Sequence, residues 1–309
     1  MDPLSKFLSL HPVTTNLDWR CELKAPWKLV NDGTDNGVAP FHLLIEGNAC
    51  LEIQNEDLII LQAGDILMLP HGTPHILHCG AESSPFPELL PAVVTKKGTL
   101  KSEGQGPTTG VLCGEFILDP IGSNFLIKSL PKVILLRTNN KNTHWHLYQL
   151  LQILNTETQT AMPGSHVIAE HISSALFSLL IRGWVMDNGA SVNVLQLFAE
   201  PRLYPAIHCL LSKPEEKLSV SELASLCHMS RATFIRLFQR KAGHSPAHLM
   251  TTIRMSLAIK FLTKPGARMS SISEMIGYSS EPAFQRAFKM HMGMTPGEYR
   301  RNKAKPVEE

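Results

Sequence analysis

Two stretches near the end of the chain carry the same pattern: LASLCHMSRATFIRLF at residues 223–238 and ISEMIGYSSEPAFQRAF at residues 272–288. Each is followed by a closing sequence, GHSP at 243–246 and GMTP at 293–296. Matching positions after the turn lie 50 residues apart, and the second copy holds one extra residue in its turn. A period of this length that occurs only twice indicates two copies of one supersecondary unit rather than a solenoid.

Each copy predicts two helices joined by a short turn, because an apolar stretch is followed by small residues and then by an amphipathic helix. In the first copy Phe234, Leu237 and Phe238 lie at i, i+3 and i+4 and therefore share a buried face. The second copy repeats this face with Phe284, Ala287 and Phe288. Two ordinary helical hairpins are the alternative, but the matched register favours helix-turn-helix units at about 219–241 and 269–291.

Charge is unevenly distributed along the chain. The formal net charge is only +2, yet residues 201–309 contain 17 Lys and Arg against 8 Asp and Glu. Basic side chains neutralise phosphates and release condensed counterions, so a local excess of them favours nucleic-acid binding. A basic face can also serve solubility alone. Here it coincides with the repeat, which favours DNA as the partner.

Residues 200–300 resemble the DNA-binding domain of the AraC/XylS family of bacterial transcription regulators. The similarity rests on LA at 223–224, MSR at 229–231, IRMSLA at 253–258, IGY at 276–278 and FQRAF at 284–288. It implies seven helices, with a long central helix that separates two recognition helices entering successive major-groove segments. Three positions depart from the family pattern: His228 replaces a glycine, Ser273 replaces an alanine, and Pro282 falls in the first turn of a helix, where its missing N–H is tolerated.

The resemblance implies that outward residues near the start of each recognition helix contact bases. They are Arg231, Ala232, Ile235 and Arg236 in the first helix, and Glu281, Gln285 and Arg286 in the second. Arg can form two hydrogen bonds to guanine and Gln two to adenine, and Ile or Ala can touch a thymine methyl group. An Arg directed to a phosphate would carry no sequence information, so both roles stay open for each arginine. The implied partners are double-stranded promoter DNA and RNA polymerase.

The first 200 residues predict a different fold. The chain has 309 residues, of which 43% are hydrophobic and 18% charged, so it can bury two cores. Short apolar or alternating runs between residues 41 and 79, separated by turn sequences, predict a small antiparallel barrel. The spacing resembles the second motif of the cupin fold at Gly64, Asp65, Pro70, Gly72 and His75. The first cupin motif is only partly present, at His42, Glu46 and Gly47.

We therefore expect an α+β protein in three parts. Residues 1–140 form a cupin-like sensor domain, in which the Pro- and Gly-rich segment 80–110 is a mobile insertion. Residues 141–200 form apolar-striped helices that link the domains and can support a homodimer. Residues 201–309 form an all-α domain with the two helix-turn-helix units.

His42, His75 and His78 are candidate ligands for a divalent metal in the barrel. Against this, His75 and His78 are three residues apart, so on one strand they would face opposite sides. A cupin metalloenzyme would need a complete ligand set and an open coordination position. The set is incomplete, and the sequence holds no GxGxxG, P-loop or nucleophile elbow, so we expect a regulator and not an enzyme.

The cysteines at positions 21, 50, 79, 113, 209 and 227 include no CxxC pair. They do not predict a disulfide framework, and most would be reduced in the cytoplasm. That compartment is expected because the sequence has neither a signal peptide pattern nor an apolar run near the roughly 20 residues that a membrane span needs. Cys50, Cys209 and Cys227 lie within apolar segments, so we expect them to be small buried hydrophobic residues.

The chain also resembles the cupin-headed AraC/XylS subgroup that responds to reactive chlorine. The similarity rests on WRC at 19–21, FH at 41–42, GD at 64–65, CG at 113–114, AMPG at 161–164 and PRL at 201–203. It implies an activator whose oxidant-sensing thiols are Cys21 and Cys113. A sensing thiol must be accessible and partly ionised, and Arg20 and Lys24 lie close to Cys21 in sequence. The alternative signal is a small-molecule ligand or a metal in the barrel.

Overall fold

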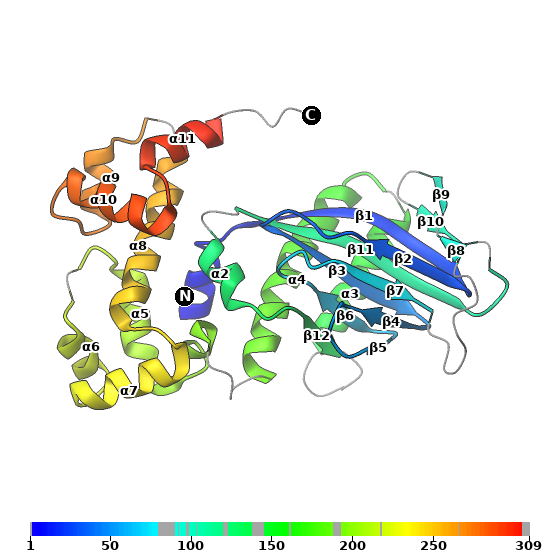
Figure 1. Cartoon of the computed structure of the whole chain (residues 1–309), viewed down its shortest axis with the longest axis horizontal. Helices are drawn as coiled ribbons and strands as arrows, with labels where there is room; N and C mark the ends of the chain where they lie inside the picture. The colour runs from blue at the N-terminus through cyan, green and yellow to red at the C-terminus, as the bar shows by residue number, and fades with distance from the viewer. Residues whose placement is uncertain are drawn as a thin grey trace. The chain divides into compact units, whose positions relative to one another are not determined.

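The computed structural model describes residues 2–79, 90–91, 93–96, 99–102, 104–119, 123–137, 145–160, 162–187, 193–216, 218–264 and 266–304. The chain divides into two compact units. The first, here called the β unit, consists of Val13–Pro120 and Leu130–Trp184. The second, the helical unit, consists of Met1–Pro12, Ile121–Ser129 and Val185–Glu309. Figure 1 labels most helices and strands of both units.

The β unit holds two sheets, with strand orders β12-β6-β3-β11-β1-β10-β9 and β5-β4-β7-β2-β8. The strands are β1 Val13–Lys24, β2 Trp27–Asn31, β3 Val38–Glu46, β4 Asn48–Glu52, β5 Ile59–Gln62, β6 Asp65–Met68, β7 His75–His78, β8 Leu90–Pro91, β9 Val93–Lys96, β10 Thr99–Lys101, β11 Thr108–Leu118 and β12 Ile134–Arg137. Most neighbouring strands are antiparallel, and β1, β11 and β3 run side by side in Figure 1. The sequence predicted such an antiparallel fold for residues 41–79.

Apolar side chains from both sheets form one core. Trp27, Leu51 and Leu77 from the smaller sheet and Leu44 and Val111 from the larger one are buried within it. The alternating apolar runs of the sequence supply these inward positions, because successive residues of a strand point to opposite faces. Cys21 belongs to the same core.

The segment 80–110, which the sequence predicted to be a mobile insertion, contains short strands among its described residues. Its described residues contribute three short strands: β8 runs parallel to β2, β10 runs parallel to β1, and β9 is antiparallel to β10. The local sequence is polar and rich in Pro and Gly, and the pairing partners β1 and β2 are distant in sequence. Residues 80–89 lie outside the described part of the chain.

Two helices follow the sheets, as the apolar stripe after residue 144 predicted. They are α3 Trp145–Thr160 and α4 Ser165–Asp187. Within the β unit Phe177 of α4 packs edge-on against Phe116, which stacks on Phe41. Among the described residues, no helix is long and apolar enough to cross a membrane.

The described part of residues 201–304 contains seven α-helices, the number that the family resemblance implied. They are α5 Tyr204–Ser212, α6 Val220–Leu226, α7 Arg231–Ala242, α8 Pro246–Leu262, α9 Met269–Met275, α10 Glu281–Met292 and α11 Pro296–Ala304. α8 lies between the pair α6–α7 and the pair α9–α10 (Figure 1). The helical unit also includes α1 Pro3–Leu8, α2 Asn124–Ser129 and the short 3₁₀ helices η1 Val194–Leu197 and η2 Pro201–Leu203.

Local capping signals explain where these helices begin and end. Ser219 and Glu222 form a capping box at the start of α6, and the hydroxyl of Ser230 accepts a hydrogen bond from the backbone N–H of Thr233 in α7. Ser280 has the same role at α10. Such caps satisfy backbone N–H groups that have no partner within the helix.

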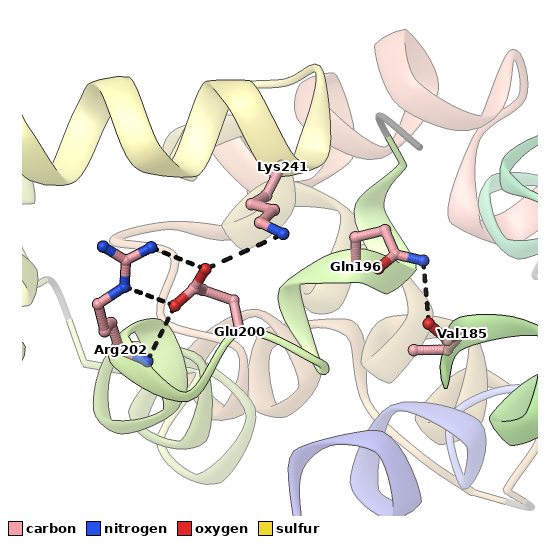
Figure 2. Close-up of polar contacts among 5 residues, drawn as sticks. All are labelled: Val185, Gln196, Glu200, Arg202 and Lys241. Atoms are coloured by element: carbon pink, nitrogen blue, oxygen red, sulfur yellow. Dashed lines mark hydrogen bonds and ion pairs between the residues drawn. The ribbon is translucent and has the colours of Figure 1, made fainter. Parts of the chain in front are cut away.

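The segment before α5 is held against the first helix pair. Figure 2 shows Glu200, whose carboxylate accepts hydrogen bonds from Arg202 at 2.7 and 3.0 Å and lies 4.0 Å from Nζ of Lys241 in α7. Beside it, Nε2 of Gln196 donates to the carbonyl of Val185 at 3.2 Å. The described part of 185–200, which was expected to belong with the linking helices, therefore packs within the helical unit.

Candidate DNA-binding surface and thiol cluster

The first helix pair buries the face that its periodicity predicted. Phe234 and Phe238 are fully buried and Leu237 nearly so. On the other face of α7, Arg231, Ala232 and Arg236 are exposed, and Ile235 is half-buried. The structure therefore places these four candidate residues on the accessible side of the helix.

The second pair repeats this arrangement. Phe284 and Phe288 are fully buried, whereas Gln285 and Arg286 are exposed and Glu281 is half-buried. Nε2 of Gln285 donates a hydrogen bond to Oε1 of Glu281 at 2.9 Å, one turn away on α10. Because an amide nitrogen carries two hydrogens, this bond orients Gln285 and leaves its second N–H and its oxygen available to a base edge.

The two turns reach the same shape with different residues. His228 in the first turn has φ 52°, and Gly277 in the second has φ 80°. Only glycine adopts this left-handed region without a steric penalty. A Cβ on Gly277 would lie 2.5 Å from the carbonyl oxygen of Glu215, so close backbone packing adds a second requirement for glycine.

A second group of candidate residues lies on three adjacent strands of the β unit. The register pairs Cys113 of β11 with His42 of β3, and Cys21 of β1 with Val111 of β11. The Sγ atoms of Cys21 and Cys113 are 3.8 Å apart, and both cysteines are in the reduced thiol form. Cys21 is 1% exposed, whereas Cys113 is half-buried. The structure thus brings together the two thiols that lie 92 residues apart in sequence.

Two histidines continue this cluster. Nδ1 of His42 lies 3.2 Å from Sγ of Cys113, and its Nε2 lies 2.8 Å from Nε2 of His75, which reaches over from β7 in the other sheet. Nδ1 of His75 lies 2.8 Å from the carbonyl oxygen of Thr73. Burial lowers the pKa of His42 to about 3, with a further contribution from His75. Burial also lowers the pKa of His75, although the hydrogen bond to Thr73 opposes this.

The three histidines expected as metal ligands do not assemble into one site. Among the residues that the structure describes, no group of three or more His, Cys, Asp or Glu side chains could hold a metal ion. The two ring nitrogens of His42 contact different partners, Nδ1 contacting Cys113 and Nε2 contacting His75. A single metal ion bound to one nitrogen of His42 therefore cannot also bind both Cys113 and His75. His78 lies instead 3.6 Å from Glu52. Within the described residues, these histidines therefore do not form the three-ligand group expected of a cupin metal centre.

Two protein-family models match the chain: a cupin model over residues 2–186 and a helix-turn-helix domain model over residues 223–302. The chain is an AraC-type transcription regulator with an N-terminal cupin domain. This regulator binds DNA through its helix-turn-helix domain and belongs to a family of transcription regulators rather than enzymes. Its α+β architecture agrees with the fold class expected from the sequence.

The sequence similarity to two other regulators extends over almost the whole chain. It is 29% identical to the RCS-specific transcriptional activator RclR of Escherichia coli strain K12, over 97% of both chains. It is 26% identical to the transcriptional regulator MtrA of Neisseria gonorrhoeae, over 97% of this chain and 98% of MtrA. Among solved structures, the DNA-binding domain of AdpA in complex with a target DNA is 26% identical, with a TM-score of 0.31, over 33% of this chain and 92% of AdpA's domain.

Two arginines of the regulator serve the fold of the helical unit, a role that sequence reasoning missed. Arg254 of α8 donates to the carbonyl oxygens of Pro214 at 2.7 Å and Glu216 at 3.0 Å, in the loop before α6. Arg300 of α11 donates to the carbonyl oxygen of Ala267 at 2.7 Å, in the loop before α9. Arg254 stands in the apolar run of 253–258, which was the available signal that it points into the protein.

Three further cysteines of the regulator are harder to ionise than an ordinary thiol. Burial is the main factor that raises the pKa of Cys50, Cys209 and Cys227. Because the thiolate is the reactive form, these cysteines are poorly suited to react. The sequence predicted small buried hydrophobic residues at all three positions, but only Cys227 is buried, whereas Cys50 and Cys209 are half-buried.

Proposed function

We propose that this regulator senses an oxidant by linking Cys21 to Cys113 and then activates transcription. The observation that carries the proposal is the distance of 3.8 Å between their Sγ atoms across adjacent strands. A disulfide requires about 2.05 Å, so closure needs the two sulfur atoms to approach each other by about 2 Å. The similarity to RclR of E. coli, which is described as an RCS-specific activator, supports an oxidant as the signal.

Recognition of the promoter falls to the two exposed helix faces. Arg231, Ala232, Ile235 and Arg236 of α7 and Glu281, Gln285 and Arg286 of α10 read bases or position the protein on phosphates. Their accessibility at the beginnings of matched helices supports this assignment. RNA polymerase is the second partner, because an activator acts through it.

A reporter assay combined with mass spectrometry of the thiols tests the proposal. In cells treated with mild hypochlorite, the wild-type regulator should raise transcription and the purified protein should contain a Cys21–Cys113 disulfide. Cys21→Ala and Cys113→Ala should each remove the response and leave basal DNA binding intact. Cys209→Ala is the matched control and should respond normally. A Cys21→Ala, Cys113→Ala double variant with a normal response would contradict the proposal and favour a small-molecule ligand in the barrel.

We also infer a homodimer formed through α3 and α4. Ile153 of α3 and Val167 and Ile168 of α4 are large apolar residues that are exposed in the single chain. Burying them against a second copy would remove apolar surface from water. Val167→Lys with Ile168→Lys should convert a dimer into a monomer in size-exclusion chromatography with light scattering. Met290→Lys, at an exposed apolar position of the helical unit, is the control. A wild type that is monomeric throughout the measured concentrations would contradict the dimer.

A further inference from the structure

A hollow of about 420 Å³ lies within the helical unit. Its walls come from α2, from the loop that joins α7 to α8, from α8 itself and from the end of α10. None of the residues assigned to base contacts lines it. Pockets that hold small molecules usually measure about 300–1,000 Å³, so the hollow has the size of a small-molecule site.

Basic side chains border this hollow without an acidic partner. His248 of α8 lies between His244 and His291, with its ring centroid 4.7 Å from the first and 6.0 Å from the second. Lys128 of α2 also lines the hollow, and no ion pair within the described residues engages its ammonium group. Among the described residues that line the hollow, none is Asp or Glu. The hollow therefore favours a negatively charged occupant.

The three histidines disfavour positive charge on one another. Burial lowers the pKa of His248, and the nearby His244 lowers it further. Burial and the nearby His248 act in the same way on the pKa of His291. A negatively charged group in the hollow would oppose this effect, because an opposite charge nearby favours the protonated imidazole. Binding of an anion should therefore raise both pKa values and take up protons.

Two uncharged side chains add hydrogen-bond donors. Ser256 of α8 is 2% exposed and lines the hollow, and no hydrogen bond within the described part of the chain engages its hydroxyl. The side-chain amide of Asn124 in α2 likewise has no hydrogen-bond partner among the described residues. Thr252 differs, because its hydroxyl donates to the carbonyl oxygen of His248 at 3.1 Å. Buried polar groups usually have partners, so the hydroxyl of Ser256 is available to a ligand.

We propose that the hollow binds the phosphate group of a small organic phosphate monoester. A phosphate monoester carries a charge of about −1.5 to −2 at pH 7 and three strong acceptor oxygens. These charges and oxygens suit the ammonium group, the imidazoles and the uncharged donors that surround the hollow. A carboxylate has a single charge and fewer oxygens, so it would leave several of these donors unused. The site goes beyond the proposed function, because it lies apart from the thiols of the β unit.

The organic part of the ligand would lie against an apolar wall. Phe125, Met290 and Met292 line the same hollow. The ring centroid of Phe125 lies 6.1 Å from that of His244 and 5.7 Å from that of His248. Among the described residues, no group of three or more His, Cys, Asp or Glu side chains could hold a metal ion, so the histidines do not indicate a metal site. The ligand would contact both the loop after α7 and the last turn of α10.

Isothermal titration calorimetry with the full-length protein tests the site, with phenyl phosphate, inorganic phosphate and phenol as probes. Phenyl phosphate should bind in a single molar equivalent, inorganic phosphate more weakly, and phenol not at all. Affinity for phenyl phosphate should rise by about threefold or more as the pH falls from about 8 to about 7, a range in which this probe stays mostly doubly charged. The cause is the uptake of protons by His248 and His291 on binding.

Lys128→Gln and His248→Gln should each weaken the binding of phenyl phosphate by about tenfold, because each removes a hydrogen-bond donor that is charged in the complex. Both side chains are exposed, so the substitutions should preserve the fold, which circular dichroism checks. His248→Gln should also make the affinity depend less on pH. Lys260→Gln on α8 and His208→Gln on α5 are matched controls outside the hollow and should bind phenyl phosphate as the wild type does.

Several results would overturn the phosphate site. They are the absence of binding at millimolar phenyl phosphate, equal binding of phenol, unchanged affinity in both Lys128→Gln and His248→Gln, and an equal loss in the two controls, which would indicate nonspecific attraction to a basic surface. DNA is the other source of phosphate for this unit. If a promoter duplex displaces phenyl phosphate and Lys128→Gln weakens binding of the duplex, the hollow is a contact for the DNA backbone and not a small-molecule site.

Discussion

The exposed arginines of α7 and α10 occupy matched positions, so their removal should cost specific affinity. Arg236→Ala or Arg286→Ala should weaken binding to the promoter site by about 1–3 kcal/mol for each lost base contact. Gel-shift titrations on the promoter site and on a scrambled duplex measure the difference. Arg240→Ala, at an exposed position in the last turn of α7, is the control and should weaken both duplexes equally. Unchanged specific affinity in both variants would show that the recognition faces lie elsewhere.

The buried His42 should make the β unit sensitive to acid. In the unfolded chain its imidazole has the ordinary pKa near 6.5, whereas in the fold the pKa is lowered to about 3. The unfolded state therefore binds more protons below pH 6.5, so stability is complete above that value and is lost as the pH falls towards 3. Between pH 7 and pH 5 the free energy of unfolding should drop by about 2 kcal/mol from this residue.

Tryptophan fluorescence during urea denaturation can measure this effect, because all four tryptophans lie between residues 19 and 184. His42→Gln should make the free energy of unfolding depend less on pH. His166→Gln, which removes an exposed imidazole, is the control and should leave this dependence unchanged. Equal slopes for wild type and His42→Gln would mean that folding does not lower the pKa of His42.

For single residues, the sequence predicted the buried and exposed faces of α7 and α10 but not the contact between Cys113 and His42. The helix period places Phe234 inside and Arg236 outside from spacing alone, because both depend on neighbours within one helix. The contact of Cys113 with His42 depends on the register of two strands 71 residues apart, which no local pattern encodes. The cysteine pair was named from family resemblance, and the same register supplies its geometry.

The turns of the two helix-turn-helix units can be compared by substituting His228 in the first and Gly277 in the second. His228→Gly should stabilise the protein by about 1 kcal/mol, because it removes a non-glycine residue from a left-handed conformation. Gly277→Ala should destabilise it by about 2 kcal/mol or more, since a Cβ would meet the Glu215 carbonyl. Urea unfolding followed by helical circular dichroism gives both values. A destabilised His228→Gly variant would show that the imidazole contributes contacts worth more than the strain.

Among the elements, helices followed their local signals and the late strands did not. Serines at 219, 230 and 280 and glycines at 243 and 293 mark the ends of helices in the sequence and do so in the structure. The segment 80–110 was assigned no core structure because its composition resembles a loop. Its strand β10 is ordered by parallel pairing with β1, a long-range contact that composition cannot reveal.

We expect the DNA-binding module to begin near residue 193, before η1, rather than at α5. The backbone N–H of Asn193 donates to the Lys241 carbonyl at 2.8 Å, and Val194, Leu195 and Leu197 are buried. A fragment of residues 193–309 should therefore unfold at a higher temperature than one of residues 204–309. The buried apolar surface should raise its free energy of unfolding by several kcal/mol. Thermal denaturation by circular dichroism compares them. Equal melting temperatures would place the boundary after η2.

The chain passes between its two units at residues 12–13, 120–121, 129–130 and 184–185. β1 begins at Val13 and β11 ends at Leu118, so the strands that carry the two thiols are also the ones that lead directly across the first two of these crossings. The proposed crosslink between Cys21 and Cys113 would therefore join the two strands that lead into these crossings. The proposed oxidation signal would then have a covalent path along the main chain, and the response should weaken when extra residues are inserted between a cysteine and its crossing.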